Sequence, residues 1–377
     1  MKSVYPLSTS SVLRGGSLFS WMIILLGGHF IGRMVVYGII YEHERIEEYY
    51  KRNHTWPPLA SEFIPLTSGW QRLYQRRFQQ VDLLTDDENA YNAYVNAVQS
   101  AITIQNYTEF GWGLTRGPIH MWKKVNDFLQ RGLPTATEEE YEDAIDADLR
   151  PLFIELPSDL KHEVLFSLQP ILEAWVGGDQ HLVPYSAYGL RVYRNTSKLY
   201  MHVDEVQTHV ISAIFHINHD EESKPWPLVI EDFHGMTVEV ILEAGDLLLY
   251  ESSKCMHGRP RRLDGKWYTS LFVHFAPSHL AASIDKQIMD THYRIPPHWP
   301  IRVESTTATD HVDAYEMIDT YCKELACPEE WCGLNESVVV RGPAPGYGRV
   351  LTQYGKVIEL ELPPEREDME KSLSDEF

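Results

Sequence analysis

The strongest constraint on the fold is a series of short strand-like runs, separated by turn signals, within residues 185–277. Their β-branched and aromatic residues favour strands. Pro225, Gly235 and Gly245 break the chain between several of them. Many short strands at this spacing predict a sandwich or jelly roll, which protects its sheet edges. The runs lie at 190–194, 208–217, 228–230, 236–242, 247–250 and 266–275.

Two imidazoles and one carboxylate stand at spacings that suit such strands. His202 and Asp204 are separated by one residue, so on a strand their side chains would share a face. His257 follows the run at 247–250, and a second strand folded back over the first would bring it to the same place. Two histidines and a carboxylate are a facial ligand set for iron(II) that leaves half of the octahedron open. An exposed polar pair is the plainer interpretation of a lone His-x-Asp in a chain with 17 histidines.

Further motifs around these residues point to a known family. Residues 185–277 resemble the iron(II)/2-oxoglutarate dioxygenases, most closely the prolyl 4-hydroxylase branch. The lysine of the motif stands nine residues after the distal histidine, one fewer than usual in that branch, so a shorter loop is expected. The resemblance covers about a quarter of the chain and implies Fe(2+), 2-oxoglutarate and O2 as cofactors, with ascorbate as reductant. The matching positions are His202, Asp204, Gly245-Asp246, His257, Lys266-Trp267 and His274.

The same resemblance implies roles for individual side chains. The three candidate ligands His202, Asp204 and His257 would hold the metal. The far carboxylate of 2-oxoglutarate needs a buried cation, because a desolvated carboxylate without a partner is costly. Lys266 would supply that cation, and Tyr193 would hydrogen-bond the same carboxylate.

These cosubstrate roles have alternatives. Lys266 could be a solvated residue after a turn, and Tyr193 could be an ordinary core aromatic. His274 shares the face of Lys266 by the two-residue period of a strand, so it could line the pocket or be a core histidine. Structural roles are expected for His209 and His216. The other cations considered are Arg259, Arg261 and Arg262, although consecutive polar residues in a turn more often face solvent.

Composition limits the partners. The formal net charge is −21, and no dense basic run is present, which argues against nucleic acid because its binders present basic surface. The acidity agrees with a basic or neutral protein substrate, or with solubility alone. With 377 residues, 44% of them hydrophobic, the chain can bury one large core or two.

Residues 18–41 form the only strongly apolar stretch, which is long enough for a membrane-spanning helix. Arg33 and His29 interrupt it, and an arginine at the centre of a span costs about 2.5–3.5 kcal/mol. We expect a signal anchor at 18–41 after a short cytosolic tail at 1–17. The product would be a single-pass type II protein of the endoplasmic reticulum or Golgi membrane, with its catalytic domain in the lumen. Signal cleavage and secretion is the alternative.

Asn-x-Ser/Thr sequons agree with a secretory route and predict a glycoprotein. They begin at Asn53, Asn106, Asn195 and Asn335.

The cysteines agree with the same route. Cys322, Cys327 and Cys332 cluster, and in an oxidising lumen one disulfide among them is expected, with its pairing open. Their spacing of five and five, without a nearby histidine, disfavours zinc. Cys255 is expected to be a buried small apolar residue.

The predicted fold class is α+β, with a double-stranded β-helix (jelly roll) core at residues 181–280, helices that buttress it and an N-terminal membrane helix. A mainly helical region is expected at 42–180. Caps and periodicity place helices at 86–100, 138–149 and 158–175, the last kinked by Pro170. Residues 281–335 would form a Cys-containing C-terminal extension, and residues 336–377 an acidic tail.

The predicted activity is an iron(II)- and 2-oxoglutarate-dependent dioxygenase that hydroxylates a protein side chain, with peptidyl proline as the leading substrate and succinate and CO2 as products. One alternative keeps this chemistry on another residue, a glycan or a small molecule. A second alternative is a non-catalytic jelly-roll scaffold or binding protein. Whether an accessory subunit is required stays open.

Overall fold

The computed structural model of the chain describes residues 67–82, 104–140, 144–280 and 331–363. The helices are α2 (Ser68–Asp82), α5 (Ile119–Gly132) and α6 (Ser158–Trp175), with 3-10 turns η2 (Leu133–Thr135), η5 (Cys332–Glu336) and η6 (Gln353–Gly355). The strands that precede the jelly roll are β1 (Trp112–Arg116), β2 (Thr137–Glu138), β3 (Ile145–Asp146) and β4 (Leu152–Ile154).

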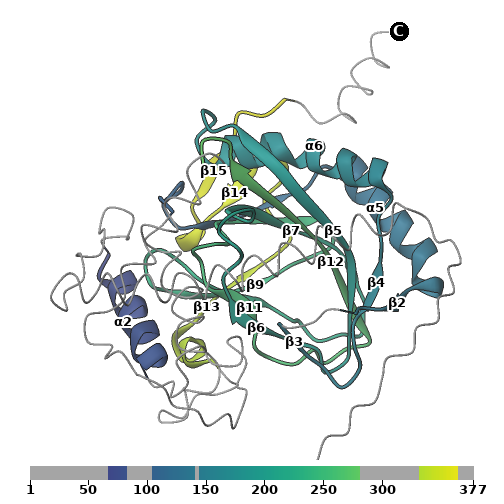
Figure 1. Cartoon of the computed structure of the whole chain (residues 1–377), viewed down its shortest axis with the longest axis horizontal. Coiled ribbons are helices and arrows are strands. Elements are labelled where there is room, and N and C mark those ends of the chain that lie inside the picture. Colours follow the sequence, from purple (N-terminus) through teal and green to yellow (C-terminus); the bar gives the residue numbers. More distant parts are fainter. Residues whose placement is uncertain (1–66, 83–103, 141–143, 281–330, 364–377) are drawn as a thin grey trace, which may run out of the picture. The chain divides into compact units, whose positions relative to one another are not determined.

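Eight consecutive strands form the jelly roll (Figure 1). They are β5 (Leu182–Arg194), β6 (Lys198–His202), β7 (Ile211–His219), β8 (Leu228–Glu231), β9 (Thr237–Ile241), β10 (Asp246–Tyr250), β11 (His257–Arg259) and β12 (Trp267–Pro277). The larger sheet contains β10-β7-β12-β5 as neighbours, and the smaller sheet contains β9-β8-β11-β6. All neighbours within these two sets of four are antiparallel. The jelly roll predicted at 181–280 is therefore confirmed.

The central strands β7 and β10 of the larger sheet are buried on both faces, which explains their apolar composition. Leu247 and Leu249 of β10 belong to a core cluster that includes residues of α5 and α6. Leu248 and Tyr250 face the opposite way, into a second cluster with residues of β1, β8 and β9. Alternation along one strand thus divides the core into a helix-facing layer and an interior layer (Figure 1).

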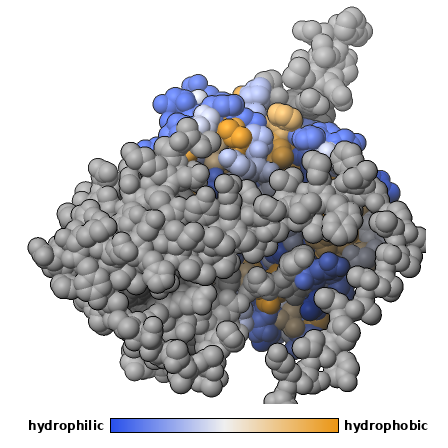
Figure 2. All heavy atoms as spheres, viewed as in Figure 1, coloured by the Kyte–Doolittle hydropathy of each residue, from blue (hydrophilic) through white to orange (hydrophobic). Residues whose placement is uncertain are grey.

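Helix α6 confirms the prediction for residues 158–175 and contains Pro170. Pro157 precedes its first turn, and no side-chain cap bond forms there. Its buried side is apolar, and Leu168 and Ile171 are fully buried in the helix-facing core. Figure 2 shows mainly hydrophilic side chains with a few apolar ones at the top of the view, where α6 lies in Figure 1.

Two predicted segments fold differently. The expected helix at 138–149 is replaced by β2, which pairs with β4, and by β3, which pairs with β6. The expected acidic tail at 336–377 contains β13 (Val338–Arg341), β14 (Arg349–Leu351) and β15 (Val357–Glu359). The β-branched run 338–340 favours a strand, and β13 extends the smaller sheet while β14 and β15 extend the larger one. The mainly helical character expected of 42–180 is thus partly wrong within the described residues.

Several other predictions fall on residues that the structure does not describe. These are the apolar stretch at 18–41, the helix at 86–100 and nearly all of the extension at 281–335 with its cysteine cluster. Among the described helices, none has both the length and the apolar character to cross a membrane. Cys255 is buried and free, as expected.

The Gly245-Asp246 turn fastens three segments at the start of β10. Gly245 has a φ of +89°, which L side chains rarely adopt. The fully buried Asp246 carboxylate accepts hydrogen bonds from Arg116 Nη1 at 2.8 Å and from the backbone N–H of Glu243 at 2.8 Å. It also accepts one from the N–H of Ala344 at 2.9 Å. One carboxylate therefore joins β1, the β9–β10 turn and the segment after β13.

Replacing Asp246 with Ala should lower the free energy of unfolding by about 3 kcal/mol, because two buried N–H groups and one guanidinium lose their acceptor. Arg116→Met should cost less, since Asp246 keeps both backbone donors. Urea denaturation of both variants measures the difference. A loss below about 1 kcal/mol for Asp246→Ala would contradict this role.

Candidate metal centre

The pairing of β6 with β11 brings the two candidate imidazoles together. His257 lies directly opposite His202 in the register of these strands. Gly258 allows the close approach, since a Cβ there would lie 2.6 Å from the carbonyl oxygen of Tyr200. Asp204 follows the end of β6, and its backbone N–H donates to the carbonyl of Ser252 in the β10–β11 loop.

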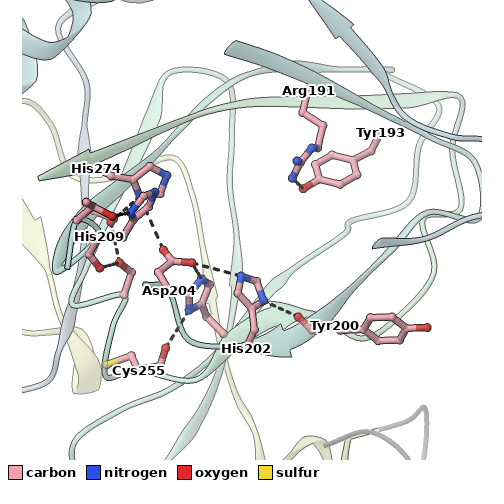
Figure 3. Close-up of polar contacts among 12 residues, drawn as sticks. Arg191, Tyr193, Tyr200, His202, Asp204, His209, Cys255 and His274 are labelled. Carbon is pink, nitrogen blue, oxygen red and sulfur yellow. Dashed lines mark hydrogen bonds and ion pairs between the residues drawn. The ribbon is translucent and has the colours of Figure 1, made fainter. Parts of the chain in front are cut away.

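The three predicted ligands His202, Asp204 and His257 converge, with one potential ligand atom from each lying within 4.8 Å of the others. Asp204 Oδ1 lies 3.4 Å from His202 Nε2 and 3.7 Å from His257 Nε2. Figure 3 shows the carboxylate of Asp204 directed toward the ring of His202. This is the arrangement expected for three ligands that occupy one face of a single cation.

Backbone carbonyls orient both imidazoles. His202 Nδ1 lies 2.7 Å from the carbonyl oxygen of Tyr200, and His257 Nδ1 lies 2.9 Å from that of Cys255. A carbonyl can only accept, so Nδ1 carries a proton in each ring, and Nε2 is the nitrogen that would bind a metal. Such outer hydrogen bonds are a regular feature of metal-binding histidines. The site therefore directs the Nε2 atoms of two imidazoles and one carboxylate oxygen toward the same place.

The electrostatics of the site favour the same protonation states. Burial lowers the pKa of His257 to about 4, with His202 adding to the shift and Asp204 opposing it. Burial alone would raise the pKa of Asp204, but the imidazoles, His257 first, hold it well below its ordinary value. At neutral pH the imidazole of His257 is thus unprotonated at Nε2 and the carboxylate is charged. These are the states in which these groups bind a metal.

A polar cluster supports the second oxygen of Asp204. Oδ2 is buried without a hydrogen bond from any described residue, and His274 Nδ1 lies 3.8 Å away. His274 Nδ1 is also 2.8 Å from Ser212 Oγ, which in turn lies 2.7 Å from Ser252 Oγ. Burial lowers the pKa of His274 to about 3, with the adjacent, tilted ring of His209 adding to the shift. His274 therefore lies beside the carboxylate of the candidate ligand Asp204; a direct contact with cosubstrate stays a prediction.

A buried acid and a buried base within the loop between β10 and β11 bind the segment at residues 104–108 and hold the loop in place. Glu251 accepts hydrogen bonds from the N–H groups of Tyr107 at 3.0 Å and Thr108 at 2.8 Å. Lys254 Nζ donates to the carbonyl of Ile104 at 2.6 Å. Burial raises the pKa of Glu251 and lowers that of Lys254. Because the loop contributes the Ser252 and Cys255 carbonyls, these contacts position both Asp204 and His257.

The structure places Lys266 away from this centre, which corrects its predicted role. Its side chain is 67% exposed, and Nζ lies 2.7 Å from Glu222 Oε2 and 3.7 Å from Asp220 Oδ1. Lys266 precedes β12 and therefore stands before the alternating, inward-facing part of that strand. The two carboxylates, which follow β7, attract the ammonium group to the surface.

The three arginines after His257 behave differently from one another. Arg261 pairs with Glu239, and the half-exposed Arg262 pairs with Asp146, in agreement with the expected solvent-facing turn. Arg259 is buried, with only 1% of its surface exposed. By the two-residue period, the sequence alone would have placed Arg259 on the face of His257, although the pairing of β11 with β6 shifts register between these two residues. That signal was available in the sequence, and its classification as a turn obscured it.

Tyr193 and Arg191 extend from β5 into the interior, across from the triad (Figure 3). Tyr193 is fully buried, and its hydroxyl lies 3.5 Å from Arg191 Nη1. Arg191 donates from Nε and Nη2 to both oxygens of Glu139, each at 2.6 Å. Tyr250, which sequence reasoning missed, packs edge-on against His257 with ring centroids 4.8 Å apart.

The fold resembles solved 2-oxoglutarate oxygenases, including prolyl hydroxylases. A prolyl-4-hydroxylase from Pseudomonas putida is 13% identical over 48% of this chain and 99% of its own, with a TM-score of 0.36. A Trichoplax adhaerens prolyl hydroxylase, solved with a peptide fragment of the hypoxia inducible factor oxygen degradation domain, is 10% identical over 58% and 97%, with a TM-score of 0.36. HygX from Streptomyces hygroscopicus, solved with nickel, 2-oxoglutarate and hygromycin B, is 14% identical over 45% and 84%, with a TM-score of 0.34.

These likenesses are distant and concern the fold alone. No family model matches the chain, and no curated protein matches it. An assignment of activity must therefore come from the side chains of the site.

His216 has the structural role that was expected of it. It is fully buried, its Nε2 lies 2.8 Å from His219 Nδ1, and its ring stacks on Tyr268 at 4.3 Å. Burial lowers its pKa well below the ordinary value, with His219 and Arg259 adding to the shift. The folded state therefore keeps this imidazole neutral under acidic conditions in which the unfolded chain protonates it.

The free energy of unfolding should consequently fall as the pH drops through about 6.5, the unfolded pKa of histidine. Between pH 7 and pH 5, His216 should account for about 2 kcal/mol of that loss. In His216→Asn the loss between these two pH values should be smaller by this amount, as urea titrations would measure. Parallel pH dependences for wild type and variant would contradict the assignment.

Proposed function

We propose that this chain is an iron(II)- and 2-oxoglutarate-dependent oxygenase that hydroxylates a side chain of a protein or peptide. The observation that carries the proposal is the convergence of His202, Asp204 and His257, with a backbone carbonyl bound to Nδ1 of each imidazole. An exposed polar pair would have neither this burial nor this orientation. A scaffold protein would have no need of an acid and two neutral imidazoles in a buried space.

The residues fit a ferrous ion by charge and by donor type. Asp204 would contribute Oδ1 and the only negative charge of the triad, and His202 and His257 would each contribute Nε2. Bound iron(II) would supply the oxidative cleavage of 2-oxoglutarate, so that O2, 2-oxoglutarate and a substrate C–H group give succinate, CO2 and a C–OH group. The hydrogen bonds of Glu251 and Lys254 keep the β10–β11 loop in place, and this loop positions the candidate ligands Asp204 and His257.

Within this class we propose peptidyl proline as the substrate, on the resemblance of the motifs to the prolyl 4-hydroxylase branch. Another residue, a glycan or a small molecule is the alternative. The surface position of Lys266 removes one motif from the resemblance, so the reaction class is better supported than the substrate. Ascorbate as reductant, an accessory subunit, glycosylation and a membrane-anchored lumenal location remain predictions.

Incubating the full-length chain with 2-oxoglutarate, O2 and a peptide pool should produce succinate only when iron(II) is added. His202→Ala and Asp204→Ala should each reduce the rate by at least about 100-fold, because each removes a ligand from a three-ligand site. Lys266→Ala is the matched control and should retain wild-type turnover. Iron-independent succinate, or unchanged turnover in both ligand variants, would refute the proposal.

Mass spectrometry of the same incubations tests the substrate. Proline-containing peptides should gain one oxygen atom on the prolyl residue, and fragment ions would locate it. A gain confined to another residue would refute the proline assignment while leaving the reaction class intact.

A further inference from the structure

We propose that Arg259 binds the distal carboxylate of the 2-oxo dicarboxylate cosubstrate, in place of the lysine position that the family resemblance indicates. The inference rests on the proposed function, because it names a cosubstrate-binding residue of the same site. It departs from the family pattern, since the cation comes from the strand of the distal histidine and not from the strand that follows.

Arg259 stands on β11, two residues after the candidate ligand His257. Its guanidinium lies between two aromatic rings, with Cζ 4.5 Å from the ring centroid of Trp226 and 4.5 Å from that of Tyr268. Nη1 donates to the carbonyl of Trp226, and Nη2 lies 3.2 Å from the hydroxyl of Tyr268. The side chain is therefore fixed by packing and by two neutral acceptors, which leave other N–H donors of the five for a ligand.

The charge of Arg259 is uncompensated within the described part of the chain. No carboxylate there forms an ion pair with it, although its exposed surface is only 1%. Burying a cation without an anionic partner lowers the stability of the fold. A ligand that places an anionic group beside the cation would remove this cost. Cation–π contacts with Trp226 and Tyr268 reduce this cost without neutralising the charge.

Three other cations of the described residues are paired with carboxylates. Arg77 pairs with Glu231 at 2.6 Å. Arg191 also faces the interior, but it donates hydrogen bonds to both oxygens of Glu139, so that carboxylate balances its positive charge. Lys266 is paired at the surface. Among these groups, the electrostatic demand for an external carboxylate is therefore greatest at Arg259.

Trp226 links Arg259 to Tyr193, which lies across the interior from the triad (Figure 3). The ring of Trp226 lies 4.5 Å from Arg259 Cζ and packs edge-on against Tyr193, with ring centroids 4.9 Å apart. On the side of the metal centre, the ring of Tyr250 packs edge-on against His257. A dicarboxylate whose keto-acid end is at the metal could direct its other carboxylate toward Arg259, with Tyr193 and Tyr250 as hydroxyl donors.

Binding of 2-oxoglutarate and of 2-oxopentanoate, which lacks only the distal carboxylate, tests this assignment without turnover. Both acids would be titrated calorimetrically into the full-length protein loaded with Mn(II). Wild type should bind 2-oxoglutarate about 100-fold more tightly, as expected for a buried, hydrogen-bonded charge pair. In Arg259→Met this preference should fall to within about threefold, while the affinity for Mn(II) stays unchanged.

Arg261→Met and Lys266→Met are the matched controls, since each removes a nearby cation that is paired with a carboxylate. Both should keep the wild-type preference. A full preference in Arg259→Met, or its loss in Lys266→Met, would overturn the assignment. If Arg259→Met reduced the affinities for both acids equally, the assignment would also be overturned, because that result indicates a structural role.

If Arg259→Met does not fold, Arg259→Lys keeps the charge but lacks the planar fork, and its preference should fall at least about tenfold. An unchanged preference in this variant would overturn the assignment. Failure of wild type to bind Mn(II) would instead remove the proposed function itself. Wild type that binds Mn(II) without distinguishing the two acids would refute only the role of Arg259.

Discussion

The pairing of two short strands, β6 and β11, is the contact on which the candidate site depends. It sets His202 opposite His257, and the chain then turns so that Asp204 reaches the same point. A slip of one residue would move one imidazole to the other face of its strand. Gly258 permits the close approach, and carbonyls of the same two segments fix the imidazole protons. The backbone thereby determines position and protonation state together.

Charge is distributed unevenly inside the jelly roll. At most buried charged groups the opposite charge is close by, as for Arg77 with Glu231 and Asp246 with Arg116. In the candidate site, Arg259 has no carboxylate partner among the described residues, and Oδ2 of Asp204 accepts no hydrogen bond from them. The proposed metal and dicarboxylate would supply the opposite charges.

Sequence reasoning predicted those parts that depend on local pattern. The strand runs, helix α6 and the convergence of His202 with His257 follow from periodicity and spacing, and the structure bears them out. Lys266 failed because its partners Asp220 and Glu222 lie more than 40 residues earlier in the chain, and no local rule links them. The segment at 138–149 has the composition of an acidic helix, yet residue 138 and residues 145–146 pair as strands with β4 and β6. Arg259 was misjudged since a three-residue strand is difficult to distinguish from a turn.

The contribution of residues 338–359 to both sheets has a consequence for synthesis. The ribosome makes β9 and β10 about 100 residues before β13 and β14, so the edge of β9 stays open and the buried acceptors of Asp246 lack the N–H of Ala344 during that interval. A nascent chain that has already brought its candidate ligands together would therefore still expose a pairing edge until β13 has been made.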